Sequence, residues 1–356
     1  MKKVMIVIPT LGNGGGERIA VSIAENLDSS KVEVLFVLLY PKQDTFNEKR
    51  AESIKKIKIV HLNKKYGTDF SVIGQLKRVI RTFKPDVIHT HLYVVPYVLL
   101  AAPKKIKKFH TVHNVAQKEA FGMRRKIHNI AFKFGNFTPV AISPLCAETI
   151  EEVYGIKKDT IPCIFNGINV DHYVHEPINH NGFRFINVGR LQSQKNQALA
   201  IRSFAKVHAK HPNTILEIVG EGELRGNLES LVEQLGLSES VMLTGQSDNV
   251  KEKLNYSDAF LQSSDYEGLP VSVLEAMACG LPIVSTKAGG TVDIVSSDKN
   301  GFLVDIGDED GLVQAMNKLI EDNNLRIAMA KESREMSMPY SIQACAKQYE
   351  KLFLNC

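Results

Sequence analysis

The sequence predicts an α/β protein of two doubly wound, Rossmann-like domains that face each other across a cleft. Its 356 residues suffice for two domains of ordinary size, and 44% hydrophobic with 23% charged residues is typical of a soluble globular protein. Short apolar runs alternate with helical patterns along the chain, which indicates parallel sheets covered on both faces. One polar interval, residues 176–182, interrupts the alternation and is interpreted as a linker.

The first series of elements starts with an apolar strand at Val4 to Pro9, a glycine loop and a helix from Glu17. Further strands are expected near Val32 to Tyr40, Lys58 to Leu62, Asp86 to His91, Lys108 to Asn114, Pro139 to Ser143 and Thr160 to Asn166, with helices at Val72 to Phe83 and Cys146 to Tyr154. The glycines do not follow G-x-G-x-x-G, and no acidic residue closes the second strand. The loop therefore gives little support for a dinucleotide site.

The second series follows the linker with the same alternation. Strands are expected at Phe183 to Gly189, Ile215 to Gly220, Val241 to Gly245, Ala259 to Gln262 and Pro282 to Thr286, and helices at Asn196 to His211, Leu224 to Leu235, Val250 to Tyr256, Asp308 to Glu321 and Asn324 to Met336. The predicted domains are therefore residues 1–175 and 183–338. A last helix within 339–356 is expected to cross back and pack on the first domain.

One stretch, residues 263–282, combines a turn, a helix start and two glutamates. Pro270 is interpreted as the first helical residue, because proline is tolerated there. A helix N-terminus offers unpaired N–H groups and a partial positive charge, so the backbone from Gly268 to Ser272 is a candidate phosphate site. Glu267 and Glu275 could accept hydrogen bonds from sugar or ribose hydroxyls. An ordinary strand-turn-helix unit of an α/β sheet explains the same spacing without a ligand.

Cations and histidines fall at other predicted strand ends. Arg190 and Lys195 follow the first strand of the second series, where arginine could clamp phosphate oxygens with its planar fork and lysine could add a compact charge. His113 ends one strand of the first series, and His89 and His91 end the preceding one. Taken singly, such a cation is more often a solvated surface residue, and such a histidine is more often structural.

A metal site is not expected. Asp308, Glu309 and Asp310 have an Asp-x-Asp spacing, but they begin a helix after Gly307, where acidic side chains act as caps. The five cysteines are scattered without a C-x-x-C pair, which argues against a zinc site and against a disulfide framework.

These motifs together resemble family 4 of the retaining glycosyltransferases, whose members have the GT-B fold. The motifs are Gly14-Gly15-Gly16-Glu17-Arg18, His113, Asn166-Gly167-Ile168, Gly189-Arg190-Leu191 with Lys195-Asn196, Glu267-Gly268-Leu269-Pro270, the run from Leu274 to Val284, and Gly289-Gly290. The likeness spans essentially the whole chain. The combination is specific, although no single motif is.

The resemblance implies a role for each matching residue. Arg190 and Lys195 would neutralise the departing diphosphate of a nucleotide sugar, Glu267 would face the donor sugar, and His113 would contact that sugar near the reacting carbon. The expected catalytic residues are therefore His113, Arg190, Lys195 and Glu267. The expected donor-binding residues are Gly14, Gly15, Gly16, Gly189, Gly268, Leu269, Pro270, Val271 and Glu275, the last on the ribose hydroxyls. Members of the family generally need no metal, so no cofactor is expected beside the nucleotide-sugar co-substrate.

The resemblance leaves the substrates open. The family's habits favour UDP as the nucleotide, carrying a hexose or an N-acetylhexosamine, with residues 183–338 on the donor side and 1–175 on the acceptor side. The acceptor would be a glycan or lipid-linked sugar in cell-surface polysaccharide or glycoconjugate assembly. One alternative is a GT-B-fold nucleotide-sugar 2-epimerase, which needs no acceptor. Another is a module that binds nucleotide sugars or glycans without turnover.

The charge of the chain is asymmetric. Residues 1–179 hold 27 Lys and Arg against 16 Asp and Glu, whereas the remainder holds 17 against 23. In the basic part, Lys104–Lys108 and Phe121–Lys126 place cations beside apolar residues, which predicts contact with an anionic membrane face and a lipid-linked acceptor. A solvated basic surface without a lipid role is the alternative.

The location of the protein follows from what the sequence lacks. No apolar run is long enough to cross a bilayer, and the N-terminus has no signal-peptide pattern. A cytoplasmic protein is therefore expected, peripheral on the inner face of the membrane if the basic surface binds there. No nucleic acid partner is expected.

Overall fold

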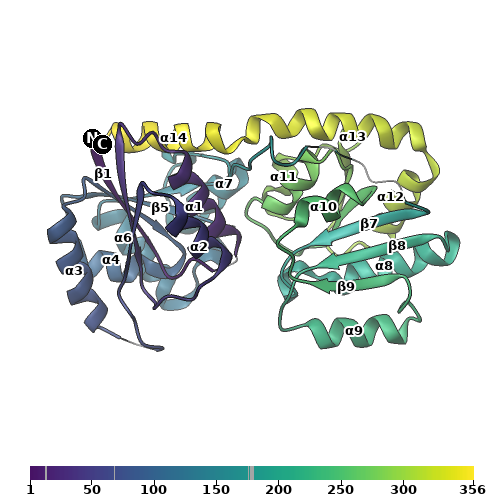
Figure 1. The fold of residues 1–356 in the computed structure, drawn as a ribbon, viewed down its shortest axis with the longest axis horizontal. Helices are drawn as coiled ribbons and strands as arrows, with labels where there is room; N and C mark the ends of the chain where they lie inside the picture. Colours follow the sequence, from purple (N-terminus) through teal and green to yellow (C-terminus); the bar gives the residue numbers. More distant parts are fainter. Residues whose placement is uncertain (13, 68, 175, 177–179) are drawn as a thin grey trace. The chain divides into compact units, whose positions relative to one another are not determined.

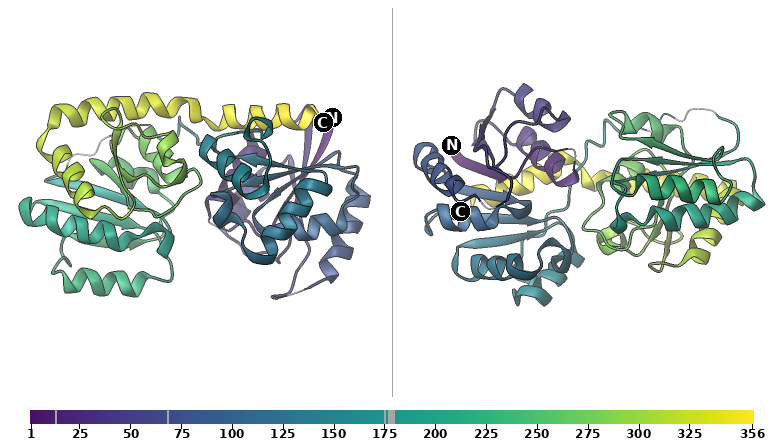
Figure 2. Two further views of the ribbon diagram at one scale, coloured as in Figure 1. Left: turned by 180° about the vertical axis from the view of Figure 1, so that it is seen from behind. Right: turned by 90° about the horizontal axis from the view of Figure 1, so that it is seen from below.

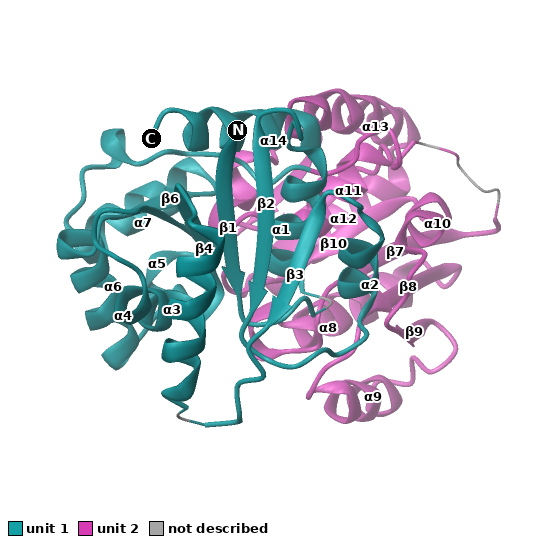
Figure 3. Ribbon diagram, turned by 60° about the vertical axis from the view of Figure 1, so that its left-hand side comes forward, with its two compact units in different colours: residues 1–167, 342–356 teal, residues 168–341 magenta. Residues whose placement is uncertain are grey.

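The structure is a computed structural model that describes residues 1–12, 14–67, 69–174, 176 and 180–356. The chain divides into two compact units, each with one six-stranded sheet (Figure 3). Unit 1 comprises Met1–Gly167 and Ile342–Cys356, and unit 2 comprises Ile168–Ser341. The predicted α/β class with two Rossmann-like halves is confirmed. Residues 177–179 of the predicted linker lie outside the described residues.

The sheet of unit 1 is parallel, with strand order β3-β2-β1-β4-β5-β6. Its strands are β1 Lys2–Ile8, β2 Val32–Leu38, β3 Ile57–His61, β4 Val87–His91, β5 Lys107–Val112 and β6 Phe137–Ala141. The helices are α1 Gly15–Asn26, α2 Phe46–Ser53, α3 Ser71–Phe83, α4 Val95–Ala101, α5 Ala116–Glu119, α6 Gly122–Phe134, α7 Pro144–Tyr154 and α14 Ile342–Leu354, with 3₁₀ turns at Leu92–Val94 and Lys158–Thr160.

Helices cover both faces of this sheet (Figure 2). α1 packs against α2 and α14, and α4 packs against α3 and α6. Right-handed crossovers place these two groups on opposite faces, since the strand order runs away from β1 in both directions. One core joins Val7, Val37 and Ile88 of the sheet to Leu76 of α3 and Val98 of α4. Burial on both sides explains why the central strands read as continuous apolar runs.

The C-terminal helix α14 belongs to unit 1, as the sequence predicted. Its side chains Tyr349 and Phe353 are buried, and the Tyr349 hydroxyl lies 2.9 Å from Thr111 Oγ1 of β5. At the surface, Lys31 Nζ donates to Glu350 Oε1 at 2.9 Å. The two termini lie side by side (Figure 1), where Lys2 Nζ donates to the carbonyl of Cys356 at 2.7 Å.

The sheet of unit 2 is also parallel, with strand order β12-β11-β10-β7-β8-β9. Its strands are β7 Phe183–Val188, β8 Thr214–Val219, β9 Val241–Gly245, β10 Ala259–Gln262, β11 Ile283–Thr286 and β12 Gly301–Val304. The helices are α8 Gln197–Lys210, α9 Arg225–Gln234, α10 Val250–Asn255, α11 Val271–Ala278, α12 Glu309–Glu321 and α13 Asn323–Ser337, with 3₁₀ turns at Ser193–Lys195, Gly289–Asp293 and Met338–Tyr340. α8 packs against α9 and α12, and α11 packs against α13.

The first segment of unit 1 ends at Gly167, earlier than the boundary at 175 that the sequence suggested. Ile168 N donates to the carbonyl of Tyr340 at 2.9 Å. Arg334 of α13 donates to the carbonyls of Val170 and Tyr173, each at 2.9 Å. Residues 168–174 are therefore held by the end of unit 2.

The strand expected at Thr160 to Asn166 is wrong. Lys158–Thr160 forms a 3₁₀ turn, and the following segment meets β6 only through an isolated bridge between Ala141 and Cys163. Pro162 has no N–H to donate, so it contributes only its carbonyl, which accepts from Ala141 N at 2.9 Å. The apolar run is buried as a sheet-edge loop instead of a seventh strand.

Candidate active site

The strand order of unit 2 reverses between β7 and β10, which are hydrogen-bonded neighbours. In open α/β sheets, ligands bind outside the carboxyl ends of the strands at such a switch point. Residues 189–196 leave the carboxyl end of β7, and residues 263–270 leave that of β10. The two loops that carry the predicted cations and Glu267 therefore start next to each other.

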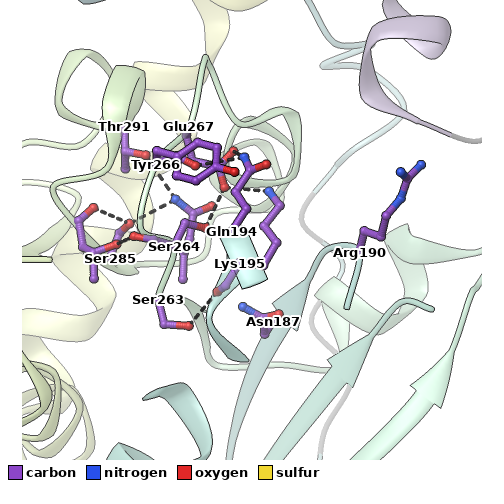
Figure 4. A network of polar contacts seen from close by, with 12 residues as sticks. Asn187, Arg190, Gln194, Lys195, Ser263, Ser264, Tyr266, Glu267, Ser285 and Thr291 are labelled. Atoms are coloured by element: carbon purple, nitrogen blue, oxygen red, sulfur yellow. Dashed lines mark hydrogen bonds and ion pairs between the residues drawn. The ribbon is translucent and has the colours of Figure 1, made fainter. Parts of the chain in front are cut away.

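Lys195 and Glu267 form the centre of a polar network at this edge (Figure 4). Lys195 Nζ donates to Glu267 Oε1 at 2.6 Å, and Ser264 Oγ donates to the same oxygen at 2.6 Å. Gln194 Nε2 lies 3.4 Å from Glu267 Oε2, the longest of these contacts. The glutamate side chain is 6% exposed and the lysine side chain 21%. Glu267 is thus a nearly buried anion held by one cation and two neutral donors, and Oε2 is its less occupied oxygen.

Helix α11 begins at Val271, so Pro270 is its N-cap and not its first residue as predicted. Pro270 has extended dihedrals (φ −72°, ψ 110°), and no side chain of the described residues caps this end. The segment from Gly268 to Pro270 is buried, with Leu269 4% exposed. The carbonyl of Pro270 accepts from Val273 N and Leu274 N at 3.2 and 3.3 Å. The N–H groups of Val271 and Ser272 are therefore the ones that a ligand at this helix end could use.

The turn Gly289-Gly290 contacts the backbone of the loop that carries Glu267 and Gly268. Gly289 has φ +53°, and a Cβ there would collide with the carbonyl oxygen of Glu267. Gly290 N donates to the carbonyl of Gly268 at 2.7 Å. Gly289 is required because two backbone segments touch here, and the bond from Gly290 holds the loop of Glu267 and Gly268 against this turn.

Glu275 lies in the same helix but in a different environment. It is 2% exposed, and Oε1 accepts a hydrogen bond from the Tyr173 hydroxyl at 2.7 Å. Tyr173 was not selected from the sequence, because it lies far from Glu275 along the chain. Their contact follows from the anchoring of residues 168–174 to α13.

Arg190 is not brought into the network. Its side chain is exposed and extends away from Lys195 and Glu267 (Figure 4). Its backbone is fixed, since the carbonyl accepts from Gln197 Nε2 at 3.1 Å. Gly189 lies beneath the stem of Lys195, where a Cβ would approach Cδ and Cε to 3.4 Å. Of the two predicted cations, only lysine is already held in place.

In unit 1 the strand order reverses between β1 and β4. The glycine loop follows β1, and α1 begins at Gly15 instead of the predicted Glu17. A Cβ on Gly16 would lie 3.5 Å from the Cδ2 and Cε1 atoms of His113. A Cβ on Gly14 would collide with the Glu17 carboxylate. The structure therefore brings the glycine loop and His113 together at this switch point, with Asn13 outside the described residues.

His113 follows β5 and is half-buried. Its Nε2 lies 2.8 Å from Nδ1 of His91, and the two rings meet edge to edge, with centroids 5.1 Å apart and planes tilted by 29°. Burial lowers the pKa of His113 to about 4, against a weaker opposing effect of the Glu119 carboxylate, and burial also lowers the pKa of His91. Both imidazoles are therefore neutral at pH 7.

The predicted basic segments differ in exposure. Lys104, Lys105, Lys107 and Lys133 line a shallow groove together with Phe134. Lys108 does not belong to this surface. It is 1% exposed, its ammonium donates to three carbonyls, and burial lowers its pKa to about 8. Its role is to tie backbone segments together.

Asp308 caps α12, as its position after Gly307 indicated. Asp308 Oδ1 accepts from Gly311 N at 2.9 Å, while Glu309 and Asp310 pair with Lys206 at 2.9 and 2.8 Å. Among the described residues, no group of three or more His, Cys, Asp or Glu side chains is arranged to hold a metal ion.

The two parts of the chain match two related descriptions. Residues 13–172 match Glycosyltransferase Family 4, and residues 173–336 match Glycosyl transferases group 1. An uncharacterized glycosyltransferase of Methanocaldococcus jannaschii is 30% identical over 331 residues, covering 78% of this chain and 81% of the relative. The chain belongs to glycosyltransferase family 4.

Two further comparisons extend over the whole glycosyltransferase. A relative in Campylobacter jejuni is 26% identical over 376 residues, and the match covers 100% of both chains. It is the N-acetylgalactosamine-N,N'-diacetylbacillosaminyl-diphospho-undecaprenol 4-alpha-N-acetylgalactosaminyltransferase. The crystal structure of HepE from Anabaena in complex with UDP-glucose superposes with a TM-score of 0.86 at 20% identity, covering 100% of both chains. This likeness shows the GT-B fold. Family membership supports a transferase over the epimerase and the binding module.

Proposed function

We propose that this glycosyltransferase moves a hexose or N-acetylhexosamine from a UDP-linked donor to a glycan or lipid-linked acceptor, with retention of the anomeric configuration. The observation that carries the proposal is the pairing of Lys195 with Glu267 beside the uncapped N-terminus of α11. The names of the relatives support the substrate classes, since one acts on a diphospho-undecaprenol acceptor and HepE is described with UDP-glucose.

The donor diphosphate would sit on the first turn of α11. Its N–H groups and helix dipole favour an anion, and Lys195 adds a full charge from the neighbouring loop. An ammonium has three N–H donors, so Lys195 can keep its bond to Glu267 while donating to a phosphate oxygen. Arg190 is exposed on the same loop and can fold onto the diphosphate with its planar fork. Ordering Arg190 on binding is the expected contribution of this residue.

Glu267 would face the donor sugar with Oε2, whose one hydrogen-bond contact within the described part of the chain is the 3.4 Å approach of Gln194 Nε2. A carboxylate oriented by Lys195 and Ser264 can accept hydrogen bonds from sugar hydroxyls without rearranging. Glu275 would accept from the ribose hydroxyls, with Tyr173 fixing its orientation. His113 of unit 1 would contact the sugar near the reacting carbon.

The reaction needs no protein nucleophile in this scheme. The bond between the anomeric carbon and the phosphate oxygen breaks, and the acceptor oxygen forms a bond on the same face. Negative charge develops on the diphosphate as this bond breaks, because the electron pair stays on the phosphate oxygen, and that oxygen then takes the proton of the acceptor hydroxyl. Fixed donors placed where charge develops stabilise the transition state without reorganisation, which is the part assigned to Lys195, Arg190 and the α11 amides.

The acceptor side is proposed to rest on an anionic membrane. Met123, Ile130 and Phe134 of α6 are 68, 50 and 65% exposed, and their spacing places them on one face of the helix. α6 starts at the carboxyl edge of the sheet, after β5, and ends at the amino edge, before β6. The apolar stripe therefore leads from the edge that holds His113 to the lysine groove at the opposite edge. Such a cation-flanked stripe suits an interfacial helix.

The membrane proposal is tested by vesicle flotation. In the described part of the chain, no helix combines enough length with enough apolar character to cross a membrane. Wild type should float with anionic vesicles, and a triple Met123→Ser, Ile130→Ser, Phe134→Ser variant should not. Phe46→Ser, which removes an aromatic ring 55% exposed on α2, is the matched control and should behave as wild type. Equal flotation with neutral vesicles would refute the proposal.

The donor proposal is tested by a panel of nucleotide sugars. Thermal shift and release of free nucleotide are measured for UDP-, GDP- and dTDP-linked hexoses and N-acetylhexosamines. UDP donors should raise the melting temperature and release UDP, and product anomeric configuration should match that of the donor by NMR. Inversion of configuration would contradict the mechanism, whereas preference for GDP would replace only the nucleotide.

A further inference from the structure

His91 lies directly behind His113 and has no part in the scheme above. It ends β4, and its side chain is buried at 0% exposure between His113 and His89. A buried histidine in contact with a group that faces substrate is a candidate for orienting that group. His91 differs from His89, which bonds away from the site to Thr111 Oγ1 at 2.8 Å.

The contact between the two rings contains one proton. Both imidazoles are neutral because burial lowers the pKa of each, and a neutral imidazole carries a single N–H. The 2.8 Å separation of His91 Nδ1 and His113 Nε2 is a hydrogen bond, so one nitrogen donates and the other accepts. Two arrangements are possible, and they give His113 opposite hydrogen-bonding character toward a ligand.

The buried Nε2 of His91 decides which of the two arrangements is favoured. If His113 donated, His91 would carry its own proton on Nε2. That atom is buried and has no hydrogen-bond partner among the described residues. An orphaned buried N–H is rarer than an unpaired acceptor, so the favourable arrangement leaves Nε2 bare and places the proton on Nδ1 of His91. His113 must then carry its proton on its own Nδ1.

The backbone of His113 is fixed independently. His113 directly follows Val112, which pairs with Ala141 of β6 at the end of β5. The carboxylate of Glu119, with its side chain 8% exposed, lies near the backbone of His113 and Asn114. The face of the ring packs against Gly16. Because the backbone of His113 and one face of its ring are held, two variables remain, the position of the ring proton and the tilt of the ring. The hydrogen bond to His91 determines both.

We propose that His91 is a positioning residue for His113, to which it donates its Nδ1–H, so that His113 presents an N–H donor at Nδ1. Such a donor recognises an oxygen acceptor, which in the proposed function is an oxygen of the donor sugar or its leaving group. Only the identity of this ligand rests on the proposed function, because the shared proton belongs to the free chain.

The direct test is the nitrogen chemical shifts of His113 in chain labelled with ¹⁵N-histidine, assigned with His113→Gln. Wild type should show protonated Nδ1 and bare Nε2 at pH 7, and in His91→Leu the two nitrogens should shift toward the Nε2–H form. His89→Leu, a matched loss of a buried imidazole on the same strand, should lower the melting temperature but leave the His113 shifts unchanged. A protonated Nε2 in wild type, or no change in His91→Leu, would overturn the inference.

Kinetics supply a second readout if His91→Leu does not fold. His91→Asn places an amide nitrogen where Nδ1 stood, so it should keep most of the wild-type kcat. His91→Leu should lower kcat by about tenfold to a hundredfold with less effect on KM, because misplacing a reacting group costs rate more than binding. Asn as damaging as Leu would overturn the proposal. If the shifts behave as stated but His113→Ala transfers normally, the proposed function fails and the proton assignment stands.

Discussion

Replacing Lys195 by methionine tests the role of the ion pair, because the stem that covers Gly189 is kept while the charge is removed. Loss of one fixed donor from a site of developing charge lowers kcat by about a hundredfold to a thousandfold, or roughly 2.7–4 kcal/mol. Stability should fall too, since the Glu267 side chain is 6% exposed and loses its 2.6 Å partner. Removing the partner of a buried polar group costs about 1–3 kcal/mol, and the surviving bond from Ser264 favours the lower half of this range.

The assays are initial rates of UDP release and urea denaturation monitored by circular dichroism. The double variant Lys195→Met, Glu267→Gln separates the two effects. It removes the unpaired carboxylate, so it should recover part of the lost stability while activity stays low. Near-normal kcat in the single variant would refute the placement of the diphosphate. Equal stability of the single variant and wild type would show that the pair is not a buried interaction.

Three other perturbations follow from particular contacts. Tyr173→Phe removes the 2.7 Å bond to Glu275 and should raise KM for the nucleotide sugar by about fivefold to tenfold with kcat unchanged; an unchanged KM would detach Glu275 from the ribose. Gly289→Ala places a side chain at φ +53° and against the backbone of Glu267, so it should destabilise unit 2 by more than about 1 kcal/mol in urea melts and abolish UDP binding. Gly226→Ala, which has open space around it, is the control and should leave the stability unchanged or raise it. Burial lowers the pKa of His113 from 6.5 to about 4, so the unfolded chain binds more protons than the folded chain between these values. The free energy of unfolding should therefore fall as the pH drops from about 6.5 to about 4. His113→Gln should flatten this fall in urea melts, and an unchanged slope would contradict a neutral His113 in the folded chain.

The central strands were predictable because both of their faces are buried. Strand β1, for example, is buried from Val4 to Ile8 and reads as an uninterrupted apolar run. The elements that were missed lack this signal. Helix α6 exposes Met123, Ile130 and Phe134, so its apolar residues do not mark a core-facing stripe, and β12 is a four-residue strand at the sheet edge.

The residues of the candidate site likewise fall into those that the sequence could predict and those that it could not. Glu267, Lys195 and the start of α11 were predictable because each directly follows a strand that meets the switch point, and loops at that position converge in any doubly wound sheet. The orientation of Arg190 was not, since a long exposed side chain has no packing to fix it. Tyr173 was not either, because its place beside Glu275 depends on long-range anchoring by Arg334.

The histidines show the limit of motif reading. The sequence placed His91 and His113 at neighbouring strand ends, and register between β4 and β5 brings them together. Their 2.8 Å contact and the unpaired Nε2 of His91 depend on side-chain packing that no spacing encodes. The same holds for Lys108, whose place in a run of lysines suggested a solvated surface although it is 1% exposed.

Hydrogen–deuterium exchange with and without saturating UDP tests the central claim most directly, because no side chain of the described residues caps the first turn of α11 and a bound diphosphate would add hydrogen bonds to its amides. The diphosphate site proposed here predicts that UDP slows exchange in peptides covering residues 268–275 and 189–196, with no comparable protection at α9, which lies away from the switch point. Calorimetric binding of UDP without protection of these two peptides would contradict the assignment of the site.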